Sequence, residues 1–478
     1  MDIYDLIVIG AGPGGYVAAV HGARLGMNVA LIEKEYVGGL CLNWGCIPSK
    51  ILLKKGAVIE AARTMIEKGE IQGIIHPLFE SIIAESRERV EAIREGLESL
   101  ITSNAVHLLY GDATFTDNKT ISVTLRDGNI KRLEAKEGII IATGSRARIL
   151  PSLIPVDREK IITSKEALML TTLPKRLIII GGGVTGCEMA SFFRSLGSIV
   201  TILEQKEVLL PNIADEEIIK TLTRGFKERG IEVICNAAIV RCGAEGNETI
   251  VATHEKELRA DYVLSAVGIT PNTDHLGLEH TDVALQNGFI PVHPNTYETN
   301  VSGIYAIGDI IALPDRIHPP MAHVASAEGE IAAEYIARKK SSWIINYDCV
   351  PSVIFTNPEI GSVGLSESRA KELYKEAIDV QRVRDSWMGI GIALKQTGLT
   401  KIIREQRHKS IVGAHIIGAY ATERIHACAV AMRAEETTPT MSKQIMAHPT
   451  YSESIREALL AFDGKAVHVP FMHQKRAQ

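Results

Sequence analysis

Cysteine and aromatic residues are scarce in this chain of 478 residues, and no apolar run is long enough to cross a membrane. Seven cysteines are too few for the disulfide framework of a secreted scaffold, and no Cys/His cluster at ligand spacing predicts a metal site. A formal net charge of −5 provides no basic surface for nucleic acid. Acidic residues, Asp2 and Asp5, lie where a signal or transit segment would carry positive charge, so we expect a cytoplasmic protein.

Glycine is abundant, and its positions include two copies of a dinucleotide fingerprint. Each copy follows an apolar run typical of a buried strand and precedes an apolar helical pattern: Gly10-x-Gly12-x-x-Gly15 and Gly181-x-Gly183-x-x-Gly186. An acid, Glu33 or Glu204, stands 23 residues after the first glycine of each copy. The glycines allow pyrophosphate to approach the backbone at a helix N-terminus, and the acid accepts hydrogen bonds from a ribose. Glycine turns of an ordinary α/β fold are the alternative, but the matched spacing predicts that the chain binds two dinucleotides.

Two of the seven cysteines, Cys41 and Cys46, are separated by four residues just after the first fingerprint. A disulfide that closes so short a loop stabilises a fold less than one that closes a long loop. Pro48 fits the first turn of a helix whose N-terminus would stabilise a thiolate at Cys46. The pair therefore indicates a redox-active disulfide, with half a zinc site or two buried thiols as the alternatives.

The order of the remaining elements predicts that one dinucleotide unit is inserted into another. Residues 81–101 have the periodicity of an amphipathic helix, and residues 112–136 alternate as a meander of short strands would. Apolar runs that end in Gly144 and Asp309 are typical of parallel strands, and they flank the second fingerprint. After Tyr347 the pattern changes to antiparallel strands mixed with helices. We therefore expect an α/β fold with two nested Rossmann-like domains and an α+β C-terminal domain.

The C-terminal part also contains a candidate general base. Imidazole side chains titrate near neutral pH, so His448 could deprotonate a thiol, and Glu453 could orient its ring. A histidine with a purely structural role is the alternative. We interpret two tryptophans, Trp44 between the cysteines and Trp387, as packing residues, with a place in the disulfide pocket as the alternative for either one.

These motifs, in this order, resemble those of the flavoprotein disulfide reductases, which are class I pyridine nucleotide-disulfide oxidoreductases. The resemblance covers essentially the whole chain, and within the family it is strongest to the dihydrolipoamide dehydrogenases. It rests on the cysteine segment, both fingerprints and the later motifs 142–144, 305–309 and 448–453. It implies an FAD-binding domain in residues 1–146 that is completed by 274–346, an NAD-binding domain in 147–273, and a dimerisation domain in 347–478.

The resemblance also implies which residues bind each cofactor. The expected FAD residues are Gly10, Gly12, Gly14, Gly15, Glu33, Lys50, Gly111, Ala113, Thr143, Gly144 and Asp309. The expected NAD residues are Gly181, Gly183, Gly186, Glu188, Glu204 and Gly268. Glu204 would repel a 2′-phosphate, and Gln205 rather than an arginine follows it, so NAD is favoured over NADP.

The implied activity is oxidation of protein-bound dihydrolipoamide to lipoamide, with reduction of NAD⁺ to NADH. Cys41, Cys46, His448, Glu453 and Lys50 are the expected catalytic residues, Lys50 pairing with Glu188 beside the flavin. The expected partners are a second copy of the chain, whose His-Glu pair would reach the disulfide, and a lipoyl-bearing protein of a 2-oxo acid dehydrogenase or glycine cleavage complex. The alternative is another NAD(P)H-dependent flavin disulfide reductase, acting on glutathione or another small disulfide.

Overall fold

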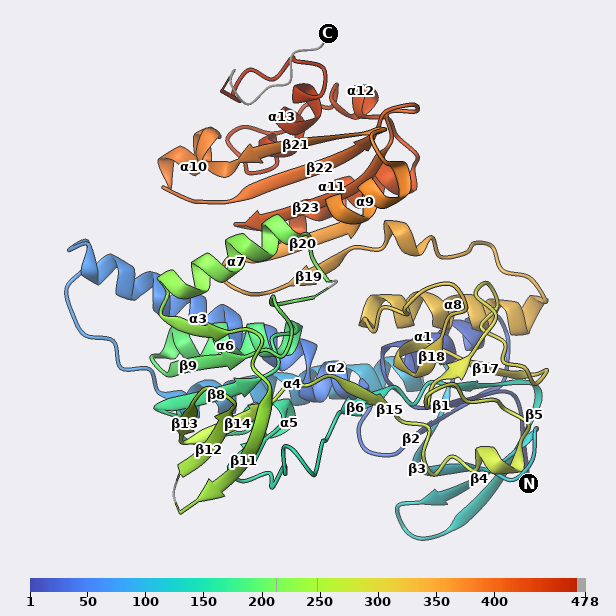
Figure 1. The fold of residues 1–478 in the computed structure, drawn as a ribbon. Helices are drawn as coiled ribbons and strands as arrows, with labels where there is room; N and C mark the ends of the chain where they lie inside the picture. Colours follow the sequence, from blue (N-terminus) through green and yellow to red (C-terminus); the bar gives the residue numbers. More distant parts are fainter. Residues whose placement is uncertain (212, 247, 471–478) are drawn as a thin grey trace.

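The computed structural model describes residues 1–211, 213–246 and 248–470, which form three lobes (Figure 1). The first lobe contains a six-stranded sheet made of β1 (Asp2–Ile9), β2 (Val29–Glu33), β3 (His107–Phe115), β4 (Thr120–Leu125), β5 (Ile130–Ile141) and β17 (Ile304–Ala306). Strands β3, β4 and β5 form the predicted antiparallel meander. β17 pairs in parallel with β5 although more than 160 residues separate them, so this sheet is completed only after the second lobe.

The second lobe is built on a parallel sheet with the order β10-β9-β8-β14-β7. Its strands are β7 (Ile161–Ile162), β8 (Arg176–Ile180), β9 (Ile199–Leu203), β10 (Ile231–Ile234) and β14 (Tyr262–Ser265). A three-stranded antiparallel sheet of β11 (Ile239–Glu245), β12 (Glu248–Thr253) and β13 (Glu257–Ala260) is attached to it. The chain enters and leaves this lobe through two paired strands, β6 (Ser145–Ala147) and β15 (Ile269–Pro271). The predicted insertion of one unit into another is therefore present.

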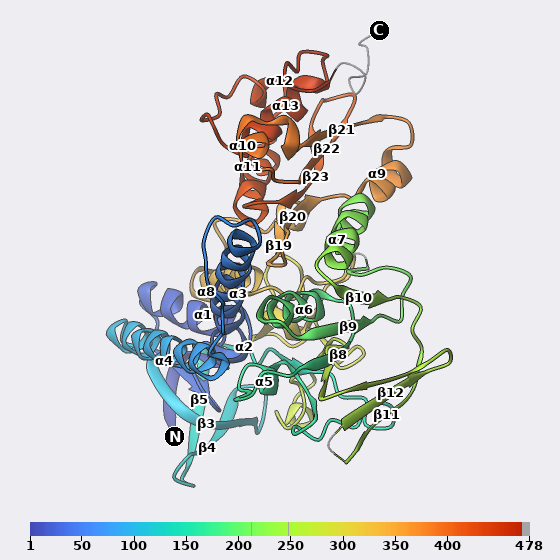
Figure 2. The same ribbon diagram turned by 90° about the vertical axis from the view of Figure 1, so that its left-hand side faces the viewer.

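The third lobe is an antiparallel sheet with the order β19-β20-β23-β22-β21, at the top of Figures 1 and 2. Its strands are β19 (Ser352–Ile354), β20 (Glu359–Gly364), β21 (Ile378–Arg384), β22 (Leu399–Glu405) and β23 (Ile411–Gly418). Helices α11 (Ala421–Arg433) and α13 (Glu453–Ala461) pack against this sheet through apolar side chains such as Ile425 and Leu459. The predicted fold class, two nested α/β units followed by an α+β lobe, is confirmed, and the exact domain limits remain predictions.

The helices that matter for the site lie at the carboxyl ends of the parallel strands. Helix α1 (Pro13–Arg24) packs against helix α8 (Ala322–Arg338), where Gly14 and Gly329 let the two backbones approach closely. The helices of the first two lobes are α1 (Pro13–Arg24), α2 (Gly39–Trp44), α3 (Cys46–Glu67), α4 (Phe79–Ser103), α5 (Ser164–Ala167), α6 (Val184–Leu196), α7 (Glu216–Glu228) and α8 (Ala322–Arg338). The third lobe adds α9 (Glu367–Tyr374), α10 (Gly389–Ala393) and α12 (Thr438–Met441). None of the helices in the described ranges could span a membrane.

A buried ion cluster joins the second lobe to the third. The Lys401 ammonium, on β22, is 2% exposed and lies 2.7 Å from carboxylate oxygens of both Asp215 and Glu367 and 3.4 Å from Glu217. Arg382 pairs with the same Glu217 and Glu367. Asp215 is also the N-cap of α7. The cluster therefore fixes the start of α7 against the C-terminal sheet, and it stabilises the lobe arrangement only while each carboxylate keeps a cationic partner.

Candidate active site

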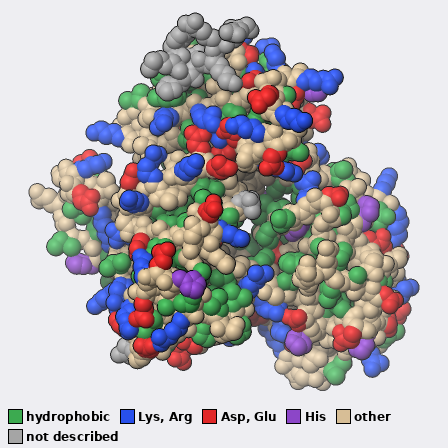
Figure 3. Space-filling view, in the orientation of Figure 1, with side chains coloured by type: hydrophobic (Ala, Val, Ile, Leu, Met, Phe, Trp, Pro, Cys, Tyr) green, Lys and Arg blue, Asp and Glu red, His purple; other side chains and the backbone are tan. Residues whose placement is uncertain are grey.

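A cavity of about 1450 Å³ runs between the first two lobes, where Figure 3 shows a hollowed surface. Its wall includes both fingerprints, both paired cysteines and both fingerprint acids, so the structure brings most of the predicted site together. The predicted residues that line it are Gly10, Gly12, Gly14, Glu33, Cys41, Cys46, Gly111, Ala113, Thr143, Gly144, Gly181, Gly183, Glu204, Gly268 and Asp309. A cavity of this volume that both fingerprints line can accommodate two dinucleotides.

The first fingerprint forms the turn between β1 and α1. Gly10 has φ +98°, and a Cβ there would lie 2.4 Å from the Ala142 carbonyl oxygen, so only glycine fits. Glu33 ends β2, and its two carboxylate oxygens accept hydrogen bonds from the backbone amides of Ala11 (2.8 Å) and Glu35 (2.7 Å). Burial raises the pKa of Glu33 above its usual value, partly offset by these amides. The amides fix the carboxylate in the cavity wall, where a ribose would lie.

The second fingerprint repeats this geometry almost contact for contact. Glu204 accepts hydrogen bonds from the backbone amides of Gly182 (2.6 Å) and Lys206 (2.8 Å). Gly181 has φ +110°, and a Cβ there would lie 2.3 Å from the Ala266 carbonyl oxygen. The equal 23-residue spacing in the sequence thus reflects one turn built twice.

The middle glycines provide the cradle that a pyrophosphate needs. A Cβ added at Gly183 would meet no atom within 4 Å, and one at Gly12 would only touch Gly39 at 4.0 Å. Because both residues line the cavity, a side chain at either one would occupy the space in front of a helix N-terminus. The residues present therefore fit two dinucleotide cofactors.

Not every predicted glycine lines the cavity. A Cβ at Gly15 or Gly186 would lie within 2.0 Å of the carbonyl oxygen of Gly10 or Gly181. These third glycines let α1 and α6 pack closely against the preceding turn, rather than line the cavity wall.

Thr143, by contrast, lines the cavity, and its hydroxyl donates to the Asn272 carbonyl at 2.7 Å.

Cys41 and Cys46 face each other across the junction of α2 and α3. Both are partly exposed thiols that share a hydrogen bond, so the predicted disulfide is not formed in this structure. A dithiol and a disulfide are two redox states of one pair, and redox cycling between them remains a prediction. Cys46 is the first residue of α3, as Pro48 predicted, so its sulfur lies at a helix N-terminus.

The two thiols have very different acidities. The hydrogen bond from Cys41 is the main cause that lowers the pKa of Cys46 to about 7; Lys50 lowers it further, while burial and Glu188 oppose the shift. The same hydrogen bond, together with burial, raises the pKa of Cys41 far above its usual value. The pair therefore holds one negative charge on Cys46 near neutral pH.

Lys50 and Glu188 form the predicted ion pair, although neither lines the cavity. The Lys50 ammonium lies 3.0 and 2.8 Å from the two carboxylate oxygens of Glu188, which is almost fully buried. Glu188 also accepts the backbone amide of Phe355 at 3.0 Å. This pair links the cysteine helix α3, the second fingerprint helix α6 and the third lobe.

His448 and Glu453 lie in the third lobe and not in the cavity wall. The His448 Nδ1 atom lies 2.9 Å from Glu453 Oε1, so the expected orienting contact exists. Burial tends to raise the pKa of Glu453, but hydrogen bonds from His448 and the Thr450 amide lower it overall. The His448 side chain is 71% exposed, and α13 lies far from α2 in both Figures 1 and 2. One chain therefore does not bring the base to the thiols.

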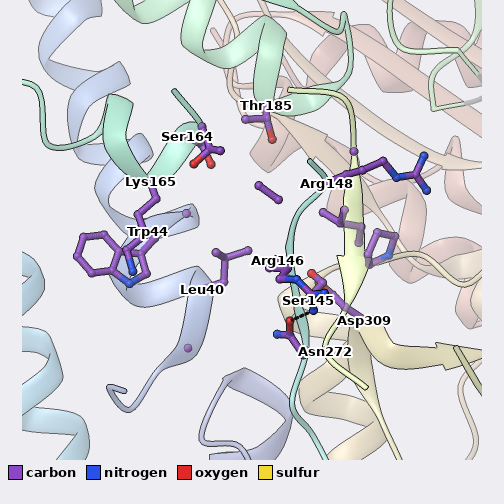
Figure 4. A pocket seen from close by; sticks show the side chains of 18 of the residues that line it. Leu40, Trp44, Ser145, Arg146, Arg148, Ser164, Lys165, Thr185, Asn272 and Asp309 are labelled. Atoms are coloured by element: carbon purple, nitrogen blue, oxygen red, sulfur yellow. Dashed lines mark hydrogen bonds between the residues drawn. The ribbon is translucent and has the colours of Figure 1, made fainter. Parts of the chain in front are cut away.

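The interpretation of Trp44 as a packing residue was wrong. Trp44 lines the cavity, and the Lys165 ammonium lies 4.5 Å from its ring centroid (Figure 4). The Arg87 guanidinium lies 4.3 Å from the same centroid. Lys165 also pairs with Glu35 at 3.0 Å. Because Trp44 lies on α2 and Lys165 on α5, this contact joins the first two lobes, which no local sequence pattern indicates. Trp387 does pack against the core of the third lobe.

The sequence pattern also missed Gly389, which is the first residue of α10. A Cβ at Gly389 would lie 3.4 Å from the His448 Cε1 atom, so this glycine borders the imidazole directly. Gly389 follows Trp387 and Met388 in the chain, so this segment lies beside the candidate base.

Comparison with known proteins agrees with this geometry. Residues 4–329 match the family model for pyridine nucleotide-disulphide oxidoreductases, and residues 350–459 match the dimerisation domain of the same family. A dihydrolipoyl dehydrogenase of Rhizobium etli is 36% identical over 98% of this chain and 99% of its own length. One of Chlorobaculum tepidum is 38% identical over 96% of this chain and 97% of its own length.

Solved structures show the same fold. LpdA from Mycobacterium tuberculosis superposes with a TM-score of 0.87 at 27% identity, covering 96% of this chain and 99% of LpdA. The HOCl-induced flavoprotein disulfide reductase RclA from Escherichia coli, solved as a Cu(II) complex, gives 0.85 at 26% identity, with the same coverage of the two chains.

Proposed function

This chain belongs to the pyridine nucleotide-disulphide oxidoreductase family, and on that premise we propose that it oxidises dihydrolipoamide to lipoamide and reduces NAD⁺. The observation that carries the proposal is the Cys41–Cys46 dithiol, with one strongly acidified sulfur, in the wall of a cavity that both dinucleotide fingerprints share. The enzyme is an oxidoreductase, and its cofactors are FAD and NAD.

The two halves of the cavity would hold different cofactors. The first fingerprint with Glu33, Thr143, Gly144 and Asp309 would hold FAD, and the second with Glu204 and Gly268 would hold NAD. FAD bound there would supply two-electron chemistry between the dithiol and NAD⁺. Glu204 favours NAD, because its fixed carboxylate would accept a free ribose hydroxyl and repel a 2′-phosphate.

The cysteines carry out the exchange with the substrate. A dihydrolipoyl thiolate attacks the Cys41 sulfur of the oxidised pair, and the Cys41–Cys46 bond breaks. Cys46 is the better leaving group, because its thiolate forms at the N-terminus of α3 and Lys50 also stabilises it. The second substrate thiolate then displaces Cys41, which closes the lipoyl disulfide and leaves the enzyme dithiol. Both cysteines are partly exposed, so acidity rather than exposure distinguishes them.

His448 would take one substrate thiol proton at a time at Nε2, while Glu453 holds Nδ1. The first proton would leave to solvent before the second is taken, and the second would pass to the displaced Cys41 sulfur. Because the third lobe of one chain keeps this base away from its own cysteines, we propose that the active enzyme is a homodimer in which each site combines the cysteines of one chain with His448 of the other. The exposed imidazole supports this arrangement.

Mixing two inactive variants tests this shared site. Cys41→Ala and His448→Gln chains, unfolded or exchanged together in equal amounts, should recover about a quarter of the wild-type dihydrolipoamide activity, since half of the dimers would be mixed and each would contain one complete site. A site built within one chain predicts no recovery. Cys41→Ala chains alone provide the matched baseline.

The substrate is tested by steady-state kinetics of the wild-type enzyme. Dihydrolipoamide with NAD⁺ should be turned over far faster than NADH-dependent reduction of oxidised glutathione or thioredoxin. Equal or greater efficiency with glutathione would contradict the proposed substrate while leaving the redox dithiol in place. A lipoyl domain from a 2-oxo acid dehydrogenase complex is the proposed protein-bound substrate, and competition between this domain and free dihydrolipoamide measures its preference.

A further inference from the structure

A fully buried carboxylate, Glu328 on α8, has no place in the chemistry described above. Its Oε2 atom accepts the backbone amide of Gly308 at 2.7 Å. Its Oε1 atom lies 2.7 Å from both His318 Nε2 and the Tyr347 hydroxyl, and that hydroxyl lies 3.1 Å from the hydroxyl of Tyr297. Three donors therefore converge on one carboxylate inside the first lobe.

Burial of this carboxylate would destabilise the fold if any of its hydrogen bonds were missing. A carboxylate without exposed surface loses its hydration, and only donors or a counter-charge can compensate. The His318 side chain is 5% exposed and directs a ring nitrogen at the carboxylate, so it can supply either a neutral donor or a positive charge. The hydrogen bonds among Glu328, His318 and Tyr347 therefore strengthen one another and hold these side chains in one arrangement.

The hydrogen bond from the Gly308 amide to Glu328 connects this network to the cavity wall. Gly308 begins the 3₁₀ turn η2 (Gly308–Ile310), has φ +75°, and lines the cavity together with the next residue, Asp309. A Cβ at Gly308 would lie 3.3 Å from the Ala325 Cβ on α8, so this turn is held between α8 and the cavity. Asp309 accepts the Ser145 hydroxyl at 2.6 Å, and Figure 4 shows both side chains at the cavity.

We propose that Glu328 and His318 are positioning residues that hold the Gly308–Asp309 turn in the cavity wall and thereby retain FAD. The proposal rests on the proposed function, because it assigns FAD to this half of the cavity. Glu328 acts through the amide of Gly308, so it determines where Asp309 stands without itself touching the cofactor.

The matched control lies on the same helix. Glu334 is also a largely buried carboxylate of α8, and it accepts the Ser342 amide and hydroxyl at 2.8 Å and the Ser341 hydroxyl at 3.1 Å, away from the cavity wall. Glu328→Gln and Glu334→Gln both remove a hydrogen-bonded carboxylate from α8. Only the first one disturbs the Gly308–Asp309 turn.

The experiment measures the rate at which dilute holoenzyme releases FAD, followed by free flavin fluorescence, together with thermal unfolding of each variant. Glu328→Gln should accelerate FAD release by about tenfold or more, and Glu334→Gln should leave the rate within about twofold of the wild type. Tyr347→Phe removes one donor to the same carboxylate and should accelerate release by about threefold, which keeps the test decisive if Glu328→Gln fails to fold.

FAD release at the wild-type rate in both Glu328→Gln and Tyr347→Phe, or an equal acceleration in Glu334→Gln, would overturn the proposal. The proposed function fails by a different observation: wild-type enzyme that retains FAD but does not turn over dihydrolipoamide. That outcome would leave the test of Glu328 intact.

Discussion

Replacing Cys41 by alanine should raise the pKa of Cys46, because the hydrogen bond from Cys41 is the largest cause that lowers it. The pKa of Cys46 is about 7, against an ordinary value of 9.0. This difference corresponds to about 2.7 kcal/mol of preferential stabilisation of the thiolate. Without the hydrogen bond, burial would act against the remaining effect of Lys50, and the pKa should return to the ordinary value or above it.

The consequence appears as a shift in the pH dependence of alkylation. At pH 7 a thiol with a pKa of about 7 is about half ionised, whereas one with a pKa of 9.0 is about 1% ionised. A more basic thiolate is also more nucleophilic, by about eightfold for this change, so the rate at one pH falls only about sixfold. The midpoint of the rate–pH profile, which moves upward by the full pKa difference, is therefore the quantity to measure.

The assay follows iodoacetamide modification of Cys46 in the reduced enzyme, with the modified peptide identified by mass spectrometry. Cys41→Ser serves as the control, because its hydroxyl can still donate to the Cys46 thiolate and should keep the midpoint closer to that of the wild type. A midpoint near pH 7 in Cys41→Ala would refute the reasoning, since Lys50 and the helix N-terminus would then suffice to acidify Cys46.

Three further predictions concern the base, the cofactor choice and the lobe contact. His448→Gln should lower turnover of dihydrolipoamide by about 10²–10⁴-fold while NADH oxidation by ferricyanide stays unchanged; an equal loss in both steady-state assays would contradict its role as the base. Glu204→Ala combined with Gln205→Arg should raise the ratio of kcat/KM for NADPH over NADH by at least about tenfold, and an unchanged ratio would argue against Glu204 as the ribose ligand. Lys401→Met removes the buried cation beside Asp215, whereas Glu217 and Glu367 keep Arg382, and it should destabilise the fold by about 3–5 kcal/mol, seen as a lower urea midpoint; a midpoint equal to that of the wild type would show that the cluster contributes little.

The fingerprints could be predicted from the sequence because each of their features serves a local task. Gly10 and Gly181 relieve a clash within a single turn, Glu33 ends β2, and Glu204 directly follows β9. The order of these units along the chain also predicted the nested α/β fold, since β17 must return to the first sheet.

Features that depend on contacts between lobes could not be read in this way. The Trp44–Lys165 contact requires two lobes to meet, and no periodicity encodes their relative placement. No local pattern distinguishes Glu328, because its partners His318 and Tyr347 lie 10 and 19 residues away in the chain. The separation of His448 from the cysteines was expected only from the family resemblance.

An anaerobic titration of the purified enzyme with dihydrolipoamide, followed by NAD⁺, tests the central claim most directly. The flavin absorption of wild-type enzyme should change on addition of dihydrolipoamide and recover with NAD⁺, with NADH formed in equal amount, whereas Cys46→Ser should show no change with dihydrolipoamide. A flavin spectrum that dihydrolipoamide leaves unaltered in the wild type, or alters equally in Cys46→Ser, would contradict electron transfer through this cysteine pair.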